Sequence, residues 1–141
     1  MKKEAVHTTN YLNTFIEIAD DCPVKSGEVP PKKEGIQTAA NLQFDMIYNS
    51  PYKYTSDDVI FSVYAYKNNI SSADKKAERE KFFSKGQPCM RSSPLTKRYG
   101  WGVHSDDKGR VALIAADSKE YHKLAKDKTT AHTKAMRSKK A

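Results

Sequence analysis

The chain has 141 residues, of which 38% are hydrophobic and 30% are charged, and its formal net charge at pH 7 is +8. A chain of this length can bury roughly two-thirds of its surface in one core, and apolar segments recur along it, which disfavours a disordered protein. It has no secretory signal pattern and no apolar run of about 18 residues, so we expect a cytoplasmic protein that neither enters a membrane nor is exported.

The positive charge is concentrated near the C-terminus. Residues 118 to 141 hold eight Lys and Arg and two acidic residues, a net charge of +6, whereas residues 1 to 117 hold 17 Lys and Arg and 15 acidic residues, a net charge of +2. A basic tail can bind polyanions, but it more often serves solubility alone. We therefore predict one domain over residues 1–133 and a solvated basic tail over residues 134–141.

The N-terminal half predicts a strand, a loop, a helix and a second strand. β-branched and aromatic residues favour a strand over 14–19, and the Gly- and Pro-rich stretch 24–35 is typical of an extended surface loop. Apolar residues at helical spacing predict a helix over 36–49, which Pro51 ends. Apolar residues at both the odd-numbered and the even-numbered positions of 57–67 predict a central strand, which is buried on both faces.

The C-terminal half predicts a charged helix, a hairpin and a last helix. Ser71 begins the charged helix over 71–85 with a capping-box-like pattern. Runs 100–105 and 110–116 indicate an antiparallel hairpin with Gly109 at positive φ, and Asp117 is expected to cap the last helix. The order strand, helix, strand, helix, hairpin, helix predicts a single α+β domain, in which a mainly antiparallel sheet of about four strands packs with about three to four helices.

One segment of the body is basic and free of acids. No acidic residue occurs between Glu80 and Asp106, whereas five cations and four aromatic residues do: Lys81, Lys85, Arg91, Lys97, Arg98, Phe82, Phe83, Tyr99 and Trp101. Ser93 as N-cap and Pro94 as first helical residue predict a short helix there, although such starts usually hold only their own cap. Because a helix start beside cations can hold a phosphate or carboxylate, we predict an anion site built from Arg91, Ser92, Ser93, Lys97, Arg98 and Trp101.

The two cysteines, Cys22 and Cys89, have no metal or redox spacing, and we expect both to be free thiols. Cys89 is near Arg91 and the predicted helix start, so it is a candidate nucleophile, with His104 as its candidate base. The alternative is that Cys89 packs as a small apolar residue and that His104 is a surface histidine on the hairpin.

Trp101 stands between Gly100 and Gly102, which permit a close approach of the backbone on either side. Its indole could stack on a base or ligand ring, whereas the only Trp of a small domain is more often a core anchor.

Acidic pairs and motifs give little support for other chemistry. Three Asp-Asp pairs could gather around a divalent cation: Asp20 with Asp21, Asp57 with Asp58, and Asp106 with Asp107. Turn and capping roles explain each pair separately, so we predict neither a metal nor a cofactor. The chain contains none of the phosphate-binding glycine loops, the zinc protease motif or the nucleophile elbow.

Three motifs carry a resemblance that covers nearly the whole chain. They are Asn41–Phe44, Pro51–Val59, and Lys85–Cys89 together with Ser93–Ser105. With them the chain resembles a bacterial family of small uncharacterised proteins, a domain of unknown function. The resemblance implies a bacterial cytosolic protein and carries over no catalytic residue.

Taken together, these features favour a small binding module for an anionic ligand, which is a nucleotide, a phosphate metabolite or a nucleic acid. One alternative is a small cysteine-dependent enzyme that uses Cys89. Another is an interaction protein without a ligand, which would bury the Tyr64 and Tyr66 face or the hairpin edge between chains. The sequence leaves the oligomeric state open.

Overall fold

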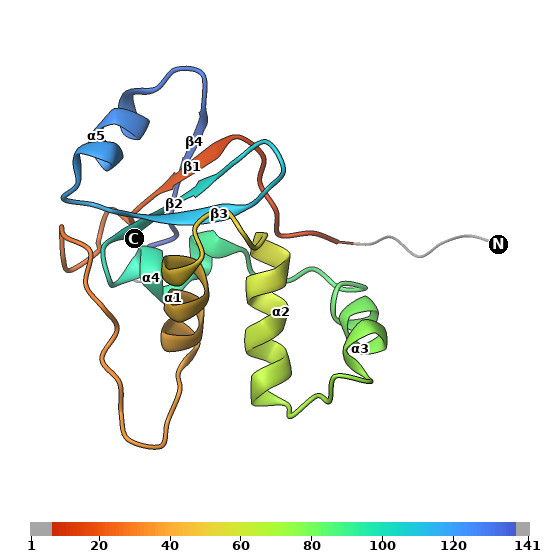
Figure 1. Ribbon diagram of the computed structural model, residues 1–141. Coiled ribbons are helices and arrows are strands. Elements are labelled where there is room, and N and C mark those ends of the chain that lie inside the picture. Colours follow the sequence, from red (N-terminus) through yellow and green to blue (C-terminus); the bar gives the residue numbers. More distant parts are fainter. Residues whose placement is uncertain (1–6, 138–141) are drawn as a thin grey trace.

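In a computed structural model of the protein, which describes residues 7–137, a four-stranded sheet lies between one helix and a group of others (Figure 1). The strands are β1 (Thr14–Glu17), β2 (Trp101–Ser105), β3 (Val111–Ala115) and β4 (Ala131–Lys134), in the order β3-β2-β1-β4. β2 is antiparallel to both β1 and β3, whereas β4 is parallel to β1. The predicted α+β class is confirmed, and the sheet is mixed because the chain crosses over before adding β4.

The helices are distributed unequally over the two faces of the sheet (Figure 1). α5 (Lys119–Lys126) covers one face, and α1 (Ala39–Asn49), α2 (Ser56–Lys67) and α4 (Pro94–Lys97) lie on the other. α3 (Lys75–Phe82) lies beyond α2, and a single 3₁₀ turn, Met90–Ser92, precedes α4. Within residues 7–137, no helix has the length and apolar character needed to span a membrane.

Adjacent residues of β1 pack into two different hydrophobic clusters, one on each face of the sheet. Phe15 turns toward α5, where its ring meets Tyr121 edge-on at 5.0 Å between centroids. Ile16 turns the other way and packs with Ile47, Val59, Met90, Val103 and Val111. This alternation follows from the period of two in a strand, and it makes β1 a central strand with both faces buried.

The prediction of a strand over residues 57–67 was wrong, because this segment forms α2. Thr55 begins the helix with a capping box: its hydroxyl accepts from the Asp58 amide at 3.2 Å, and the Asp58 carboxylate accepts from the Thr55 amide at 3.0 Å. Apolar residues at both odd-numbered and even-numbered positions also suit a helix that packs against other elements on several of its sides. Phe61 and Ala65 accordingly pack with Phe83, which follows α3.

Other elements differ from the predictions mainly at their ends. The hairpin is confirmed, with φ of 79° at Gly109, and α1 begins later than predicted, at Ala39 after its N-cap Thr38. Ser118 caps α5 in place of Asp117, since its hydroxyl accepts from the Tyr121 amide at 3.1 Å. The short strand β4 was not predicted.

The end of the chain stays close to the fold as far as it is described. β4 ends at Lys134, and the next residue, Ala135, is buried. Of the basic tail predicted over 134–141, residues 138–141 lie outside the described residues.

Candidate functional site

A hollow of about 330 Å³ lies between the beginning of α1 and helix α4. We call it the α1–α4 hollow. Its walls come from two parts of the chain that are far apart in sequence: Thr38, Ala39 and Ala40 on one side, and Ser92, Pro94, Lys97, Arg98 and Tyr99 on the other. Three of the six residues predicted for an anion site, Ser92, Lys97 and Arg98, therefore line one hollow.

The beginning of α1 forms one side of this hollow. Thr38 caps the helix, and its hydroxyl accepts from the Asn41 amide at 3.2 Å. The amides of Ala39 and Ala40 have no acceptor among residues 7–137, and the first turn holds no acidic residue. The first amides of a helix carry its positive dipole end, so this side of the hollow favours negative charge.

The opposite side contributes two cations. Lys97 is the last residue of α4 and Arg98 follows it directly, so the short helix brings both side chains to the wall of the hollow. Neither cation has an ion-pair partner in the described part of the chain. Two cations and the first residues of α1 therefore line one hollow, and both contribute positive potential to it.

The beginning of α4, where an anion was expected, is closed by protein. Ser93 is only 3% exposed; its hydroxyl donates to Oε1 of Gln43 at 2.5 Å and accepts from the Leu95 amide at 3.1 Å. The helix that offers free amides is therefore α1 and not α4, and α1 begins more than fifty residues before Ser93.

Arg91 and Trp101 do not line the α1–α4 hollow. Nε of Arg91 donates to the carbonyl of Lys134 at 2.7 Å, which directs this side chain to the end of β4. Trp101 is 7% exposed, and its indole donates to the carbonyl of Glu28 at 2.8 Å. Its ring packs against Phe44 in the core, so the structure gives Trp101 the place of a core anchor.

A model of a family of unknown function, DUF6157, matches residues 6–141. The chain belongs to this family. The resemblance to a domain of unknown function is thereby confirmed, and the family description gives no activity. Comparison with curated proteins and with solved structures finds no match.

In this DUF6157 member, the two candidate catalytic residues, Cys89 and His104, lie on different sides of the sheet. Sγ of Cys89 is 3.5 Å from the Tyr11 phenol oxygen, on the side of α1 and α2, and this contact raises the pKa of Tyr11. His104 pairs across strands with Phe15 on the α5 side, and its Nδ1 lies 2.8 Å from the Tyr52 phenol oxygen. The structure therefore does not bring the proposed nucleophile and base together.

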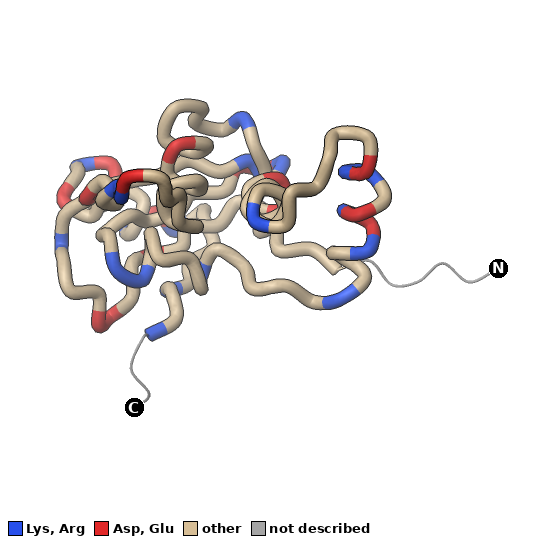
Figure 2. Tube along the Cα trace, turned by 90° about the horizontal axis from the view of Figure 1, so that it is seen from below, with Lys and Arg blue, Asp and Glu red and all other residues tan. Residues whose placement is uncertain are grey.

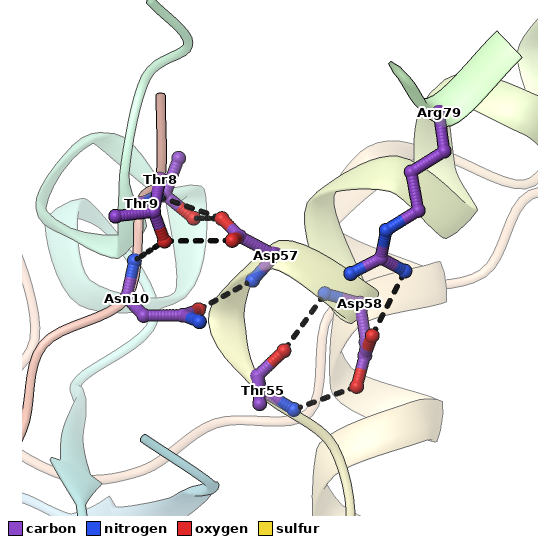
Figure 3. Close-up of polar contacts among 7 residues, drawn as sticks. All are labelled: Thr8, Thr9, Asn10, Thr55, Asp57, Asp58 and Arg79. Carbon is purple, nitrogen blue, oxygen red and sulfur yellow. Dashed lines mark hydrogen bonds and ion pairs between the residues drawn. The ribbon is translucent and has the colours of Figure 1, made fainter. Parts of the chain in front are cut away.

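A polar cluster that sequence reasoning missed joins the N-terminal segment to α2 (Figure 3). The Asp57 carboxylate accepts from the hydroxyl of Thr8 and from the amide and hydroxyl of Thr9, each at 2.7 Å, and the Asp57 amide donates to Asn10. Because protein donors satisfy this carboxylate, the cluster anchors residues 8–10 to the helix start and leaves little capacity for a ligand.

The three Asp-Asp pairs remain separate. Asp20 contacts Lys134 at 2.9 Å, Asp58 contacts Arg79 at 2.9 Å, and Asp106 contacts Arg110 at 3.0 Å. Within residues 7–137, no group of three or more His, Cys, Asp or Glu is placed to hold a metal ion.

Proposed function

We propose that this protein is a binding module for an anionic ligand, whose phosphate or carboxylate group is held in the α1–α4 hollow. The observation that carries the proposal is that Lys97 and Arg98 line the same hollow as Ala39 and Ala40, whose amides have no acceptor among residues 7–137. We also propose that it acts in the cytoplasm of a bacterium; the two free cysteines support a reducing compartment.

The two donor sets differ in what they offer an anion. The amides of Ala39 and Ala40 are fixed by the helix, so they bind an oxyanion without losing side-chain freedom. Arg98 adds a planar fork of donors that matches a phosphate or carboxylate, and Lys97 adds a point charge. The Ser92 hydroxyl lies on the same wall, but its single proton already donates to Sδ of Met136 at 3.1 Å, so the donors of the site are the amides and the two cations.

The remaining wall supports a ligand that is larger than a bare ion. Ala39, Ala40 and Pro94 are apolar, and the half-buried ring of Tyr99 stands beside the cations. A volume of about 330 Å³ exceeds what one phosphate group occupies and is at the lower end for small-molecule sites. These features support a phosphate ester with an organic group, such as a nucleotide or a sugar phosphate.

Calorimetric titration with inorganic phosphate and with adenosine monophosphate at low salt tests the proposal. Lys97→Ala and Arg98→Ala should each weaken binding by about tenfold, because each removes a charge-assisted hydrogen bond. Ala39→Pro is a sharper variant: proline is favoured at the first position of a helix, so it removes one amide donor while α1 stays intact. We expect it to weaken phosphate binding by about threefold to tenfold.

Lys108→Ala is the matched control, because this exposed cation lies in the hairpin turn, outside the α1–α4 hollow. It should bind both ligands as the wild type does. Absence of heat with either ligand, or binding that survives both Lys97→Ala and Arg98→Ala, would refute the site.

A further inference from the structure

The α1–α4 hollow continues along the molecule. A second hollow, of about 230 Å³, lies between α1, α2 and residues 87–94, and it shares Ala39, Ser92 and Pro94 with the first. A third, of about 570 Å³, lies beside α3 and shares Phe82 and Gln87 with the second. The three adjoin one another, because each shares lining residues with the next. We call them together the groove.

Positive charge marks both ends of the groove. Lys97 and Arg98 line its first hollow, and Lys81 and Lys85 line its third. Among residues 7–137, the only acidic residue that lines any of the three is Glu78, which lies 3.8 Å from Lys81. Figure 2 shows the same bias along the chain, where the stretch between α3 and β2 carries Lys and Arg but no Asp or Glu. A polyanion would meet complementary charge at both ends.

Aromatic rings accompany the cations at each end. Tyr99 stands beside Lys97 and Arg98. Tyr64 and Phe82, whose ring centroids are 4.5 Å apart, stand beside Lys81 and Lys85. All three rings are partly exposed. Between the two ends the walls are largely apolar, with Ile60, Val63 and Pro88.

From this arrangement we infer that the groove binds a single-stranded nucleic acid, an inference that rests on the proposed anion site and extends it. Single strands are held by cations that contact phosphates and by aromatic faces that stack on unpaired bases, and both features recur at both ends of the groove. A duplex hides its base faces and would use only the cations. An acidic peptide would likewise leave the three rings unused, so the unpaired strand fits best.

The test compares ligands of different length. A fluorescent oligothymidylate of about ten nucleotides should bind at least about tenfold more tightly than thymidine monophosphate, because it reaches both ends of the groove. The double variant Lys81→Ala, Lys85→Ala should weaken the oligonucleotide by about tenfold and leave the monophosphate unchanged. The same variant should reduce the slope of log K against log salt by about 1.4, which corresponds to two lost phosphate contacts on a single strand.

Further variants test whether binding depends on the groove or only on the net positive charge of the protein. Phe82→Leu should weaken the oligonucleotide by about tenfold through lost stacking. The matched double variant Lys123→Ala, Lys126→Ala, on the exposed side of α5 across the sheet, should bind as the wild type does. Deleting residues 138–141 should also leave binding unchanged; loss of binding there would assign it to the C-terminus and overturn the inference.

The outcomes distinguish the nucleic-acid groove from the anion site on which it rests. If the monophosphate binds and requires Arg98, but the oligonucleotide binds no more tightly or ignores Lys81 and Lys85, the anion site stands and the groove is refuted. Tighter binding of a duplex or of an acidic decapeptide would refute the groove in the same way. If Lys97→Ala and Arg98→Ala leave both ligands unaffected, both conclusions fail together.

Discussion

The phenol oxygen of Tyr52 lies 2.8 Å from Nδ1 of His104, so a residue of the α1–α2 connection is tied to strand β2. Tyr52 has a φ of 58°, in the left-handed region that non-glycine residues seldom adopt, and its amide donates to the Val111 carbonyl at 2.9 Å. The two rings meet edge-on at 5.7 Å between centroids. The contact therefore helps to hold a costly backbone conformation against the outer edge of β3.

Mild acid should destabilise the fold through His104. Burial lowers the pKa of His104 below its usual value of 6.5, while Asp106 and Asp127 oppose that change. Between this lowered pKa and about 6.5, the unfolded chain binds more protons than the folded protein, so the free energy of unfolding falls as the pH falls through that window. Urea unfolding between about pH 8 and about pH 5 measures the effect.

The control for this experiment is a histidine on the surface. His104→Gln should remove part of the pH dependence in that window, whereas His122→Gln, on the exposed side of α5, should retain it. Identical pH profiles for the wild type and His104→Gln would show that His104 does not titrate differently on folding.

Two glycines with similar backbone angles should respond very differently to alanine. Gly35 and Gly100 have φ of 72° and 76°, so each alanine carries the left-handed cost of about 1 to 2 kcal/mol. A Cβ at Gly35 would meet nothing within 4 Å, whereas one at Gly100 would lie 2.0 Å from the Ser26 carbonyl oxygen. Denaturant unfolding should therefore show a loss of about 1 to 2 kcal/mol for Gly35→Ala and of at least about 3 kcal/mol for Gly100→Ala. Equal losses would mean that the segment around Ser26 shifts away from the added Cβ at no cost.

Two neighbouring carboxylates at the start of α2 should also differ in their contribution. Asp57→Ala leaves the buried Thr9 amide without its acceptor, and we expect the free energy of unfolding to fall by about 3 kcal/mol (Figure 3). Asp58→Ala removes a cap and a half-exposed ion pair with Arg79, and we expect about 1 kcal/mol. Hydrogen exchange at the Thr9 amide should accelerate only in Asp57→Ala. Comparable exchange in both variants would contradict the anchoring role of Asp57.

The sequence predicted those elements in which the conformational preferences of the residues match the structure that they adopt. The hairpin was predictable because alternating strands flank Gly109, whose φ of 79° a glycine adopts without cost. α2 was not, since its Val, Ile, Phe and Tyr residues also suit a strand; Thr55 and Asp58, three residues apart, were the signal that would have indicated a helix. β4 is short and mostly exposed, and it is a strand because β1 offers it an open edge.

The candidate site was predictable only in its local half. Lys97 and Arg98 are neighbours in sequence, so their charge was visible without the fold. That the start of α1 faces them depends on a contact between segments more than fifty residues apart, which no spacing rule supplies. The burial of Ser93 likewise depends on Gln43, a residue of α1.

Trp101 gives the sharpest separation between a ligand contact and a core contact. Its indole donates to the Glu28 carbonyl, and its ring covers Gly27 so closely that a Cβ there would lie 2.9 Å from it. Trp101→Phe should therefore remove the indole hydrogen bond to Glu28 and leave a partly empty space in the core, and lower the free energy of unfolding by about 2 kcal/mol. The affinity for phosphate should stay within about twofold of the wild type, because the Trp101 ring does not line the α1–α4 hollow. Denaturant unfolding and titration of the same sample measure both quantities. Unchanged stability with lost affinity would instead restore Trp101 to the ligand site that the sequence predicts.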